Sequence, residues 1–126
     1  MFDRFMRVLS AVLLVGLAGC FTPSVPIPPP EPEKMTFDVD FESGQAQFSY
    51  EANPSYGDAV VYVFNRDKGV GLITTAGPDG SVPPTGGFPA EEYDQVVITF
   101  ELDTQQASTC VELHDGPSSS EYECNP

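Results

Sequence analysis

Few residues of this chain are of types that carry out chemistry: among 126 residues there are one histidine and three cysteines. His114 is followed by Asp115, and serines lie nearby, so a small Ser–His–Asp hydrolase is one interpretation of this region. A catalytic triad is defined by geometry rather than by adjacency, and no serine sits in a nucleophile-elbow glycine pattern. A single histidine also leaves too few ligands for a zinc site. We therefore expect His114 to be a turn residue, and we predict neither an enzyme nor a cofactor.

The acidic residues offer a second kind of chemistry, the binding of a hard cation. Calcium prefers several carboxylate and carbonyl oxygens, which loops can gather. Four acidic residues at or near predicted strand ends are candidate calcium ligands: Asp58, Glu91, Asp94 and Asp103. No EF-hand spacing is present, so a calcium-binding surface module is an alternative rather than the main prediction. A pair of catalytic carboxylates at Glu91 and Asp94 is less favoured, because no aromatic platform for a sugar accompanies them.

Aromatic side chains in predicted loops are candidate contact residues for a partner protein. Three of them precede the last strands and one lies in the C-terminal tail: Tyr56, Phe88, Tyr93 and Tyr122. The pattern favours the alternative interpretation, in which these side chains cover the open ends of the core.

The start of the chain has the three regions of an export signal. Two arginines within the first seven residues precede an apolar run from Val8 to Leu17. This run is shorter than the roughly 20 residues that a transmembrane helix needs. The segment Leu17-Ala18-Gly19-Cys20 resembles the lipobox of bacterial lipoproteins. The resemblance implies that residues 1–19 are removed and that Cys20 becomes a lipid-modified N-terminus.

The lipobox resemblance also implies where the protein resides. Lipoproteins carry a diacylglyceryl group on the cysteine and usually a further acyl chain such as palmitate, and two or more chains hold a protein stably on a membrane. Phe21 follows the cysteine, where an aspartate would resemble the signal for retention in the inner membrane. We expect a lipid-anchored protein of the bacterial cell envelope, in the outer membrane.

The two remaining cysteines, Cys110 and Cys124, are expected to form a disulfide. An exported protein meets an oxidising environment, and the lipid occupies the third thiol. Closing a loop of about 15 residues stabilises a small domain by roughly 3 kcal/mol in the chain-entropy model.

The charge of the mature chain excludes two classes of partner. After removal of residues 1–19, three basic residues remain against eighteen acidic ones. Such a negative field repels nucleic acid and anionic lipid head groups. The expected partners are the membrane, through the lipid, and an envelope protein.

A proline-rich segment and a single domain follow Cys20. The segment Phe21–Lys34 has six prolines in fourteen residues and is expected to be an extended, semi-rigid spacer. We therefore divide the chain into a signal peptide (residues 1–19), a lipidated cysteine with its tether (20–34) and one domain (35–126).

The domain has the alternation of strands and the turn residues of an all-β fold. Period-two apolar patterns occupy 35–41 and 46–50, and apolar runs with β-branched residues occupy 59–64, 70–76, 95–102 and 107–113. The continuous run Ala59–Phe64 predicts a strand covered on both faces, and Gly71 is a possible bulge. About seven short strands, with Ser81-Val82 among them, predict one small antiparallel β-sandwich after the signal-peptide helix and the linker.

The middle of the domain reads AVVYVFNRDKGVGLITTAGPDGSVPP, and EEYDQVVITFEL follows it. These stretches resemble the transthyretin-like and carboxypeptidase-regulatory-like Ig-type sandwiches of bacterial surface lipoproteins. The chain departs from them at Val82, where an aromatic residue is usual, and in the Pro83–Phe88 loop. The resemblance implies an Ig-like fold and a non-catalytic structural or binding module.

Overall fold

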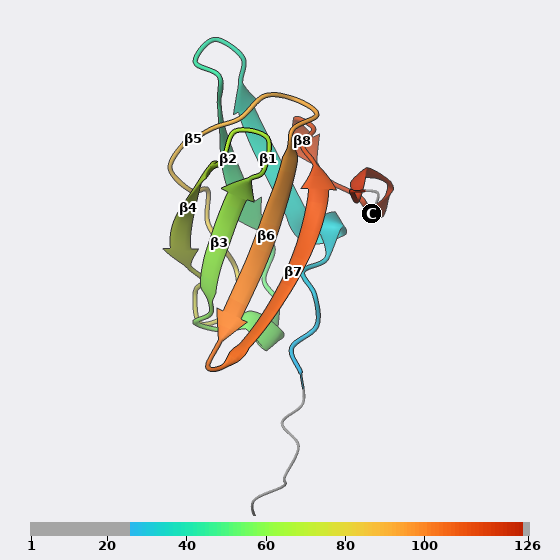
Figure 1. Cartoon of the computed structure of the whole chain (residues 1–126). Helices are drawn as coiled ribbons and strands as arrows, with labels where there is room; N and C mark the ends of the chain where they lie inside the picture. The colour runs from blue at the N-terminus through green and yellow to red at the C-terminus, as the bar shows by residue number, and fades with distance from the viewer. Residues whose placement is uncertain (1–25, 125–126) are drawn as a thin grey trace, which may run out of the picture.

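Two antiparallel sheets of four strands each pack face to face as a small β-sandwich (Figure 1). The computed structural model describes residues 26–124, so the predicted signal peptide, Cys20 and the first part of the spacer lie outside the described residues. No helix within residues 26–124 has the length and apolar character needed to cross a membrane. The predicted all-β class and the antiparallel sandwich are thus confirmed.

The first sheet has the strand order β5-β2-β1-β8. Its strands are β1 (Met35–Asp40), β2 (Gln45–Tyr50), β5 (Phe88–Pro89) and β8 (Gly116–Pro117). The two period-two patterns form β1 and β2, which pair as an antiparallel hairpin with Phe37 opposite Phe48. Because side chains alternate between the two faces of a strand, both rings point into the core, with their centroids 5.5 Å apart.

The second sheet has the order β4-β3-β6-β7. Its strands are β3 (Val60–Asn65), β4 (Val70–Thr75), β6 (Gln95–Leu102) and β7 (Gln105–Glu112). The β3–β4 register runs without interruption from Val60↔Thr75 to Asn65↔Val70, so the bulge considered at Gly71 does not occur. A Cβ at Gly71 would lie 2.1 Å from the Val63 carbonyl oxygen, and the close approach of the two backbones is what requires glycine there.

Three short segments differ from the prediction. Ser81-Val82 forms only an isolated bridge between Val82 and Tyr50. The Pro83–Phe88 loop runs into β5, which pairs with β2. The C-terminal segment contains a short 3-10 helix, η3 (Ser120–Tyr122), and a single bridge to β7. Each difference involves two to four residues, a length at which the alternation of side chains carries little information.

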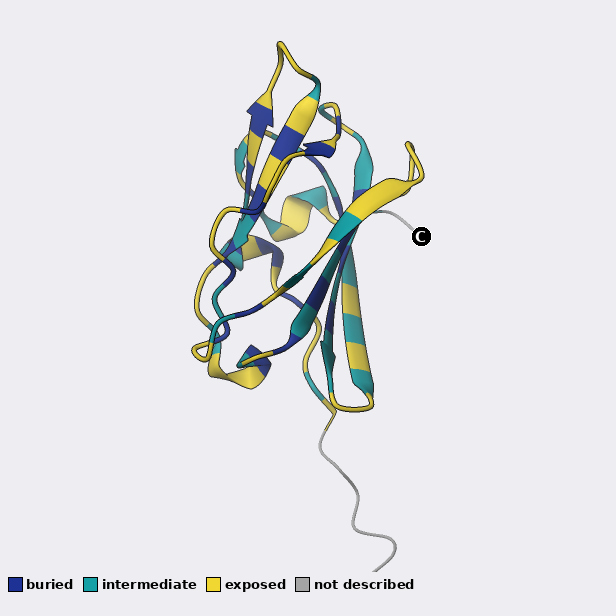
Figure 2. Ribbon diagram, turned by 90° about the vertical axis from the view of Figure 1, so that its left-hand side faces the viewer, coloured by how far each residue is buried: buried dark blue, intermediate teal, exposed yellow. Residues whose placement is uncertain are grey.

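The run Ala59–Phe64 is covered on one face only, so the prediction of a strand buried on both faces is wrong. Val61 and Val63 are buried between the sheets, whereas Phe64 on the other face is 45% exposed. Figure 2 shows this alternation of buried and exposed residues along the strands. The continuous apolar run therefore marks an apolar outer surface rather than a third layer.

The sandwich begins before the predicted boundary at Met35. Pro30 and Pro32 are buried, and Ile27 packs against the core. The Thr109 hydroxyl donates to the Pro30 carbonyl (2.6 Å), and the Ile27 N–H donates to the Gln105 side chain (2.8 Å). The described part of the predicted spacer, residues 26–34, is thus attached to the domain and includes a 3-10 turn, η1 (Pro32–Lys34).

The loop after β4 requires glycine at one position. Gly80 has φ = +80°, and a Cβ there would lie 1.7 Å from the Asn53 carbonyl oxygen. The preceding Asp79 accepts hydrogen bonds from the Ser81 hydroxyl (2.6 Å) and backbone N–H (3.0 Å). These bonds hold the pKa of Asp79 below its ordinary value. The conformation of this turn therefore depends on both Asp79 and Gly80.

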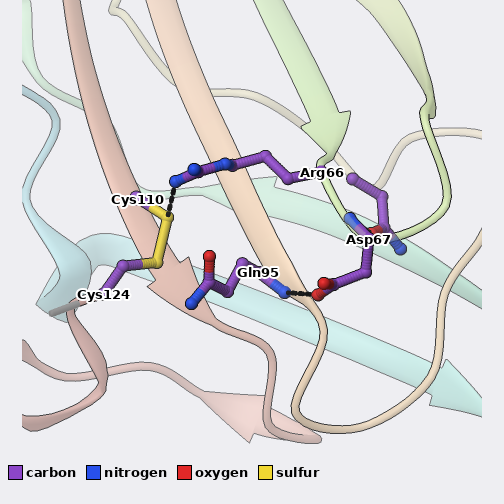
Figure 3. The surroundings of a disulfide bond; sticks show 6 residues. Arg66, Asp67, Gln95, Cys110 and Cys124 are labelled. Atoms are coloured by element: carbon purple, nitrogen blue, oxygen red, sulfur yellow. Dashed lines mark hydrogen bonds between the residues drawn. A yellow bond between two sulfur atoms is a disulfide. The ribbon is translucent and has the colours of Figure 1, made fainter. Parts of the chain in front are cut away.

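The predicted disulfide between Cys110 and Cys124 is present (Figure 3). Its Cα atoms are 5.3 Å apart, and the Cys124 N–H donates to the Cys110 carbonyl (2.9 Å). The Arg66 guanidinium reaches across β6 to within 3.8 Å of the Cys110 sulfur. The disulfide therefore joins the C-terminal segment to the outer strand β7.

Replacing both of these cysteines by serine is expected to lower the free energy of unfolding by about 3 kcal/mol, because the unfolded chain then loses a closed loop. Chemical denaturation of the double variant, and of the wild type with reductant, measures the change. The two should agree, since both remove the same cross-link. A denaturation midpoint that is the same with and without the bond would contradict the prediction.

Candidate functional site

Five large apolar side chains are exposed on the described part of the chain, and they define where a partner could make contact. They are Phe41, Phe64, Val70, Ile73 and Tyr93. Scattered single residues of this kind are common on protein surfaces, whereas a group of them marks an interaction surface. Three of the five belong to the β3–β4 hairpin: Phe64 and Ile73 share its outer face, whereas Val70, opposite the buried Asn65, lies on the other face.

Two of the predicted contact aromatics are buried instead. Tyr56 is 0% exposed and stacks on Phe100 with a centroid distance of 4.3 Å. Phe88 is also buried, because β5 turns its side chain into the core. The interpretation that aromatic residues cover the open ends of the core therefore holds for Tyr56 and Phe88. Tyr93 behaves differently, with 63% of its surface exposed.

Tyr93 lies in an aromatic cluster with His114 and Tyr122. The His114 ring stacks on Tyr122 (centroids 3.8 Å apart), and Tyr93 meets it edge-on (5.2 Å). The Tyr93 backbone has φ = +74°. Its N–H donates to the Leu113 carbonyl (2.8 Å), and this hydrogen bond helps to hold that backbone conformation. The cluster joins the loop before β6 to the C-terminal segment that the disulfide anchors.

His114 packs against aromatic side chains of two loops. Its Nε2 is 3.8 Å from the Glu112 carboxylate, and within residues 26–124 no hydrogen bond joins it to a serine. A general base needs its nucleophile within hydrogen-bond reach. The ring instead packs between two tyrosines, so its observed role is to connect loops.

The four candidate calcium ligands do not come together. Glu91 and Asp94 precede β6, beside the end of β3, whereas Asp58 and Asp103 lie beside the start of β3 and the end of β6. Within the described residues, no group of three or more histidine, cysteine or acidic side chains is placed to hold a metal ion. The sequence could not reveal this, since strand ends that look alike lie at opposite ends of a sheet.

Asp94 has protein partners in place of a cation. Its Oδ2 accepts hydrogen bonds from the Asn65 amide (2.8 Å) and from the Glu91 N–H (3.0 Å). Lys68 approaches Glu91 at 3.6 Å and Asp94 at 3.9 Å. The buried Asn65 amide also donates to the Pro89 carbonyl and accepts from the N–H groups of Asp67 and Lys68. This network connects the β3–β4 turn to the loop before β6.

The outer face of the first sheet is polar and carries a shallow groove. The groove has a volume of about 340 Å³, and its polar lining includes Asp38, Gln47, Ser49 and Asp115. Asp115 accepts a hydrogen bond from the Val39 N–H (2.9 Å) and so helps to hold β1 in place. The two outer faces thus differ in character, the first sheet being polar and the β3–β4 part of the second being apolar.

The sequence reasoning missed Asn65 and the apolar outer surface of β3 and β4. Asn65 was visible only as the first residue of a turn. The apolar outer surface could have been found from the sequence, because the run from Val70 to Thr75 has no charged residue. Neither protein-family models nor curated proteins nor solved structures gave a match to this chain.

Proposed function

We propose that this chain is a lipid-anchored protein of the bacterial cell envelope whose β-sandwich serves as a non-catalytic structural or binding module. The observation that carries the proposal is the order of segments in the sequence. An export signal is followed at once by Leu17-Ala18-Gly19-Cys20, then by a proline-rich segment and one small domain. The Ig-like and transthyretin-like resemblance belongs to the same proposal.

Two structural observations support it. The Cys110–Cys124 disulfide suits a protein that folds in an oxidising compartment. The chain enters the sandwich beside the β6–β7 turn, where Ile27 binds Gln105, and Tyr93 and the β3–β4 turn lie at the other end of the second sheet. A tether attached at residue 26 would leave that other end free to meet a partner.

The non-catalytic part of the proposal depends on the surroundings of the reactive residue types. His114 packs between tyrosines, and Asp94 is hydrogen-bonded to Asn65. Both groups are thus engaged with neighbouring side chains, which is typical of a structural role.

Intact mass of the membrane-extracted protein tests the anchor. The expected mass is that of residues 20–126 plus acyl groups, with two cysteines that react with an alkylating agent only after reduction. The Cys20→Ser variant should retain residues 1–19 and carry no acyl group, because the thiol that accepts the lipid is gone.

The variant with serine at positions 110 and 124 is the matched control, since it loses two thiols but keeps Cys20. It should remain lipidated and in the membrane fraction. A wild-type protein that carries no lipid and retains residues 1–19 would overturn the proposed localisation.

A further inference from the structure

Residues 26–34 are attached to the sandwich at several points rather than hanging from it. Near their start, the Ile27 N–H donates to the Gln105 side chain (2.8 Å), and the Pro28 carbonyl accepts from the Tyr56 hydroxyl. Because Gln105 begins β7, these bonds hold the segment at the end of the sandwich where β6 turns into β7. In Figure 1 the chain leaves the domain at that same end.

Two further hydrogen bonds hold the middle of the segment. The Thr109 hydroxyl on β7 donates to the Pro30 carbonyl (2.6 Å), and the Glu31 N–H donates to the Tyr50 hydroxyl on β2 (3.0 Å). Pro30 and Pro32 are buried. Proline has a fixed φ and therefore loses little conformational freedom when it is held in place. A segment bonded to strands of both sheets cannot rotate relative to the domain.

This attachment shortens the free part of the predicted spacer. Pro26 is the first described residue and the sixth residue after Cys20. A fully extended chain advances at most about 3.6 Å per residue, so the two residues are at most about 22 Å apart. A spacer that ran free as far as Lys34 would reach more than twice as far.

We propose that residues 26–34 are a rigid mount, which fixes the height and the orientation of the domain on its membrane. This inference rests on the proposed lipid anchor at Cys20. The β6–β7 end of the sandwich then faces the lipid at a distance of at most about 22 Å. Strand β6 has eight residues and spans about 27 Å, so the end that carries Tyr93 lies at most about 50 Å from the lipid. A partner of that end must meet it within this height.

Attraction between the domain and lipid does not account for this orientation. The β6–β7 turn consists of Asp103 and Thr104 and contains no basic residue. Anionic head groups repel an acidic turn. The hydrogen bonds of the mount therefore determine which end of the sandwich faces the membrane.

Energy transfer from a dye on the domain to an acceptor-labelled lipid tests the mount. The lipidated full chain is placed in vesicles of phosphatidylcholine, whose head groups have no net charge. Thr104→Cys puts the dye on the β6–β7 turn, and Glu42→Cys puts it on the β1–β2 turn, at the opposite end in Figure 1; both positions are exposed. Cys110 and Cys124 are bonded to each other, so a maleimide dye reacts with the new cysteine.

We expect energy transfer to be at least about twofold more efficient from position 104 than from position 42, because the two ends of the sandwich differ in height by about 27 Å. A dye at either end of a freely rotating domain would give the same average efficiency.

A triple variant releases the start of the mount. Tyr56→Phe, Gln105→Ala and Thr109→Val together remove the three side-chain partners of residues 27–30 and keep the core ring. We expect the difference between the two dye positions to fall at least about twofold, because a freed segment samples many orientations. Thr99→Val is the matched control. It removes a hydroxyl of the same sheet, which bonds to Ser108 (2.7 Å) and not to the mount, and should leave the difference unchanged.

Two results with lipidated protein would overturn the mount alone: equal energy transfer from positions 42 and 104 in the wild type, or a difference that persists in the folded triple variant. If the triple variant does not fold, the wild-type comparison decides by itself. A protein without lipid, recognised by its intact mass, would overturn the proposed anchor and the mount together.

Discussion

Replacing Tyr56 by alanine is expected to lower the free energy of unfolding by about 4 kcal/mol, as for other large aromatic residues in protein cores. The Tyr56 ring is fully buried, stacks on Phe100 and meets Tyr50 edge-on at a centroid distance of 6.0 Å. The ring joins η2 (Pro54–Tyr56) to both sheets, through Tyr50 on β2 and Phe100 on β6. Urea denaturation monitored by circular dichroism measures the loss.

Tyr56→Phe is the matched control, since it keeps the ring and removes only the hydroxyl. That hydroxyl donates to the Pro28 carbonyl, and burial raises the pKa of Tyr56. We expect a loss of about 1 kcal/mol and faster proteolysis within residues 26–34. If the alanine variant lost no more stability than the phenylalanine variant, the ring would not be part of the core.

Replacing Asn65 by alanine is expected to lower the free energy of unfolding by about 3 kcal/mol. The amide is fully buried and makes four hydrogen bonds, two as donor and two as acceptor. Removal of a buried partner costs about 1–3 kcal/mol for each group left unpaired, and more for a charged group such as Asp94. The exposed backbone N–H groups of Asp67 and Lys68 can donate to water instead, which reduces the total loss of unfolding free energy. Denaturation with urea gives the value, and an unchanged midpoint would show that water replaces the whole network.

Asn65→Asp is a sharper test because it changes charge at nearly constant shape. The new carboxylate still accepts from the backbone of the turn but faces the Asp94 oxygen, which lies 2.8 Å from the Asn65 amide nitrogen. Two carboxylates this close hold a shared proton rather than both ionising. A proton bound more tightly in the folded state stabilises that state at acid pH, and this gain is lost as the pH rises. The deficit of this variant relative to wild type should therefore shrink between pH 7 and pH 4, and by more than the deficit of Asn65→Ala, in which no second carboxylate faces Asp94.

The six long strands could be predicted from the sequence because their signal is local. In Met35–Tyr50, apolar residues two positions apart must share a face, and the turn between the strands contains Gly44 at φ = +70°. The disulfide followed from elimination, since one of three cysteines had another predicted use. The lipobox resemblance and the envelope location remain predictions, because Cys20 lies outside the described residues.

The candidate sites were predicted poorly because they depend on contacts between distant residues. Tyr56 and Tyr93 both lie in short loops between strands, yet the first stacks on Phe100, 44 positions away, and the second is exposed. Asp58 and Asp94 both lie beside strand ends, but the antiparallel order of β3 and β6 places them at opposite ends of the sheet. Residue type cannot distinguish these cases.

By itself the sequence determined the all-β class, the turns, the pairing of Cys110 with Cys124 and the acidic character of the surface. These depend on residues close together in the chain or on composition. Only the tertiary structure decided that residues 26–34 pack on the sandwich and that Asn65 organises one end of it. These depend on which strands become neighbours. The order of neighbouring strands arises from the packing of all the apolar faces together, so no local sequence pattern predicts it.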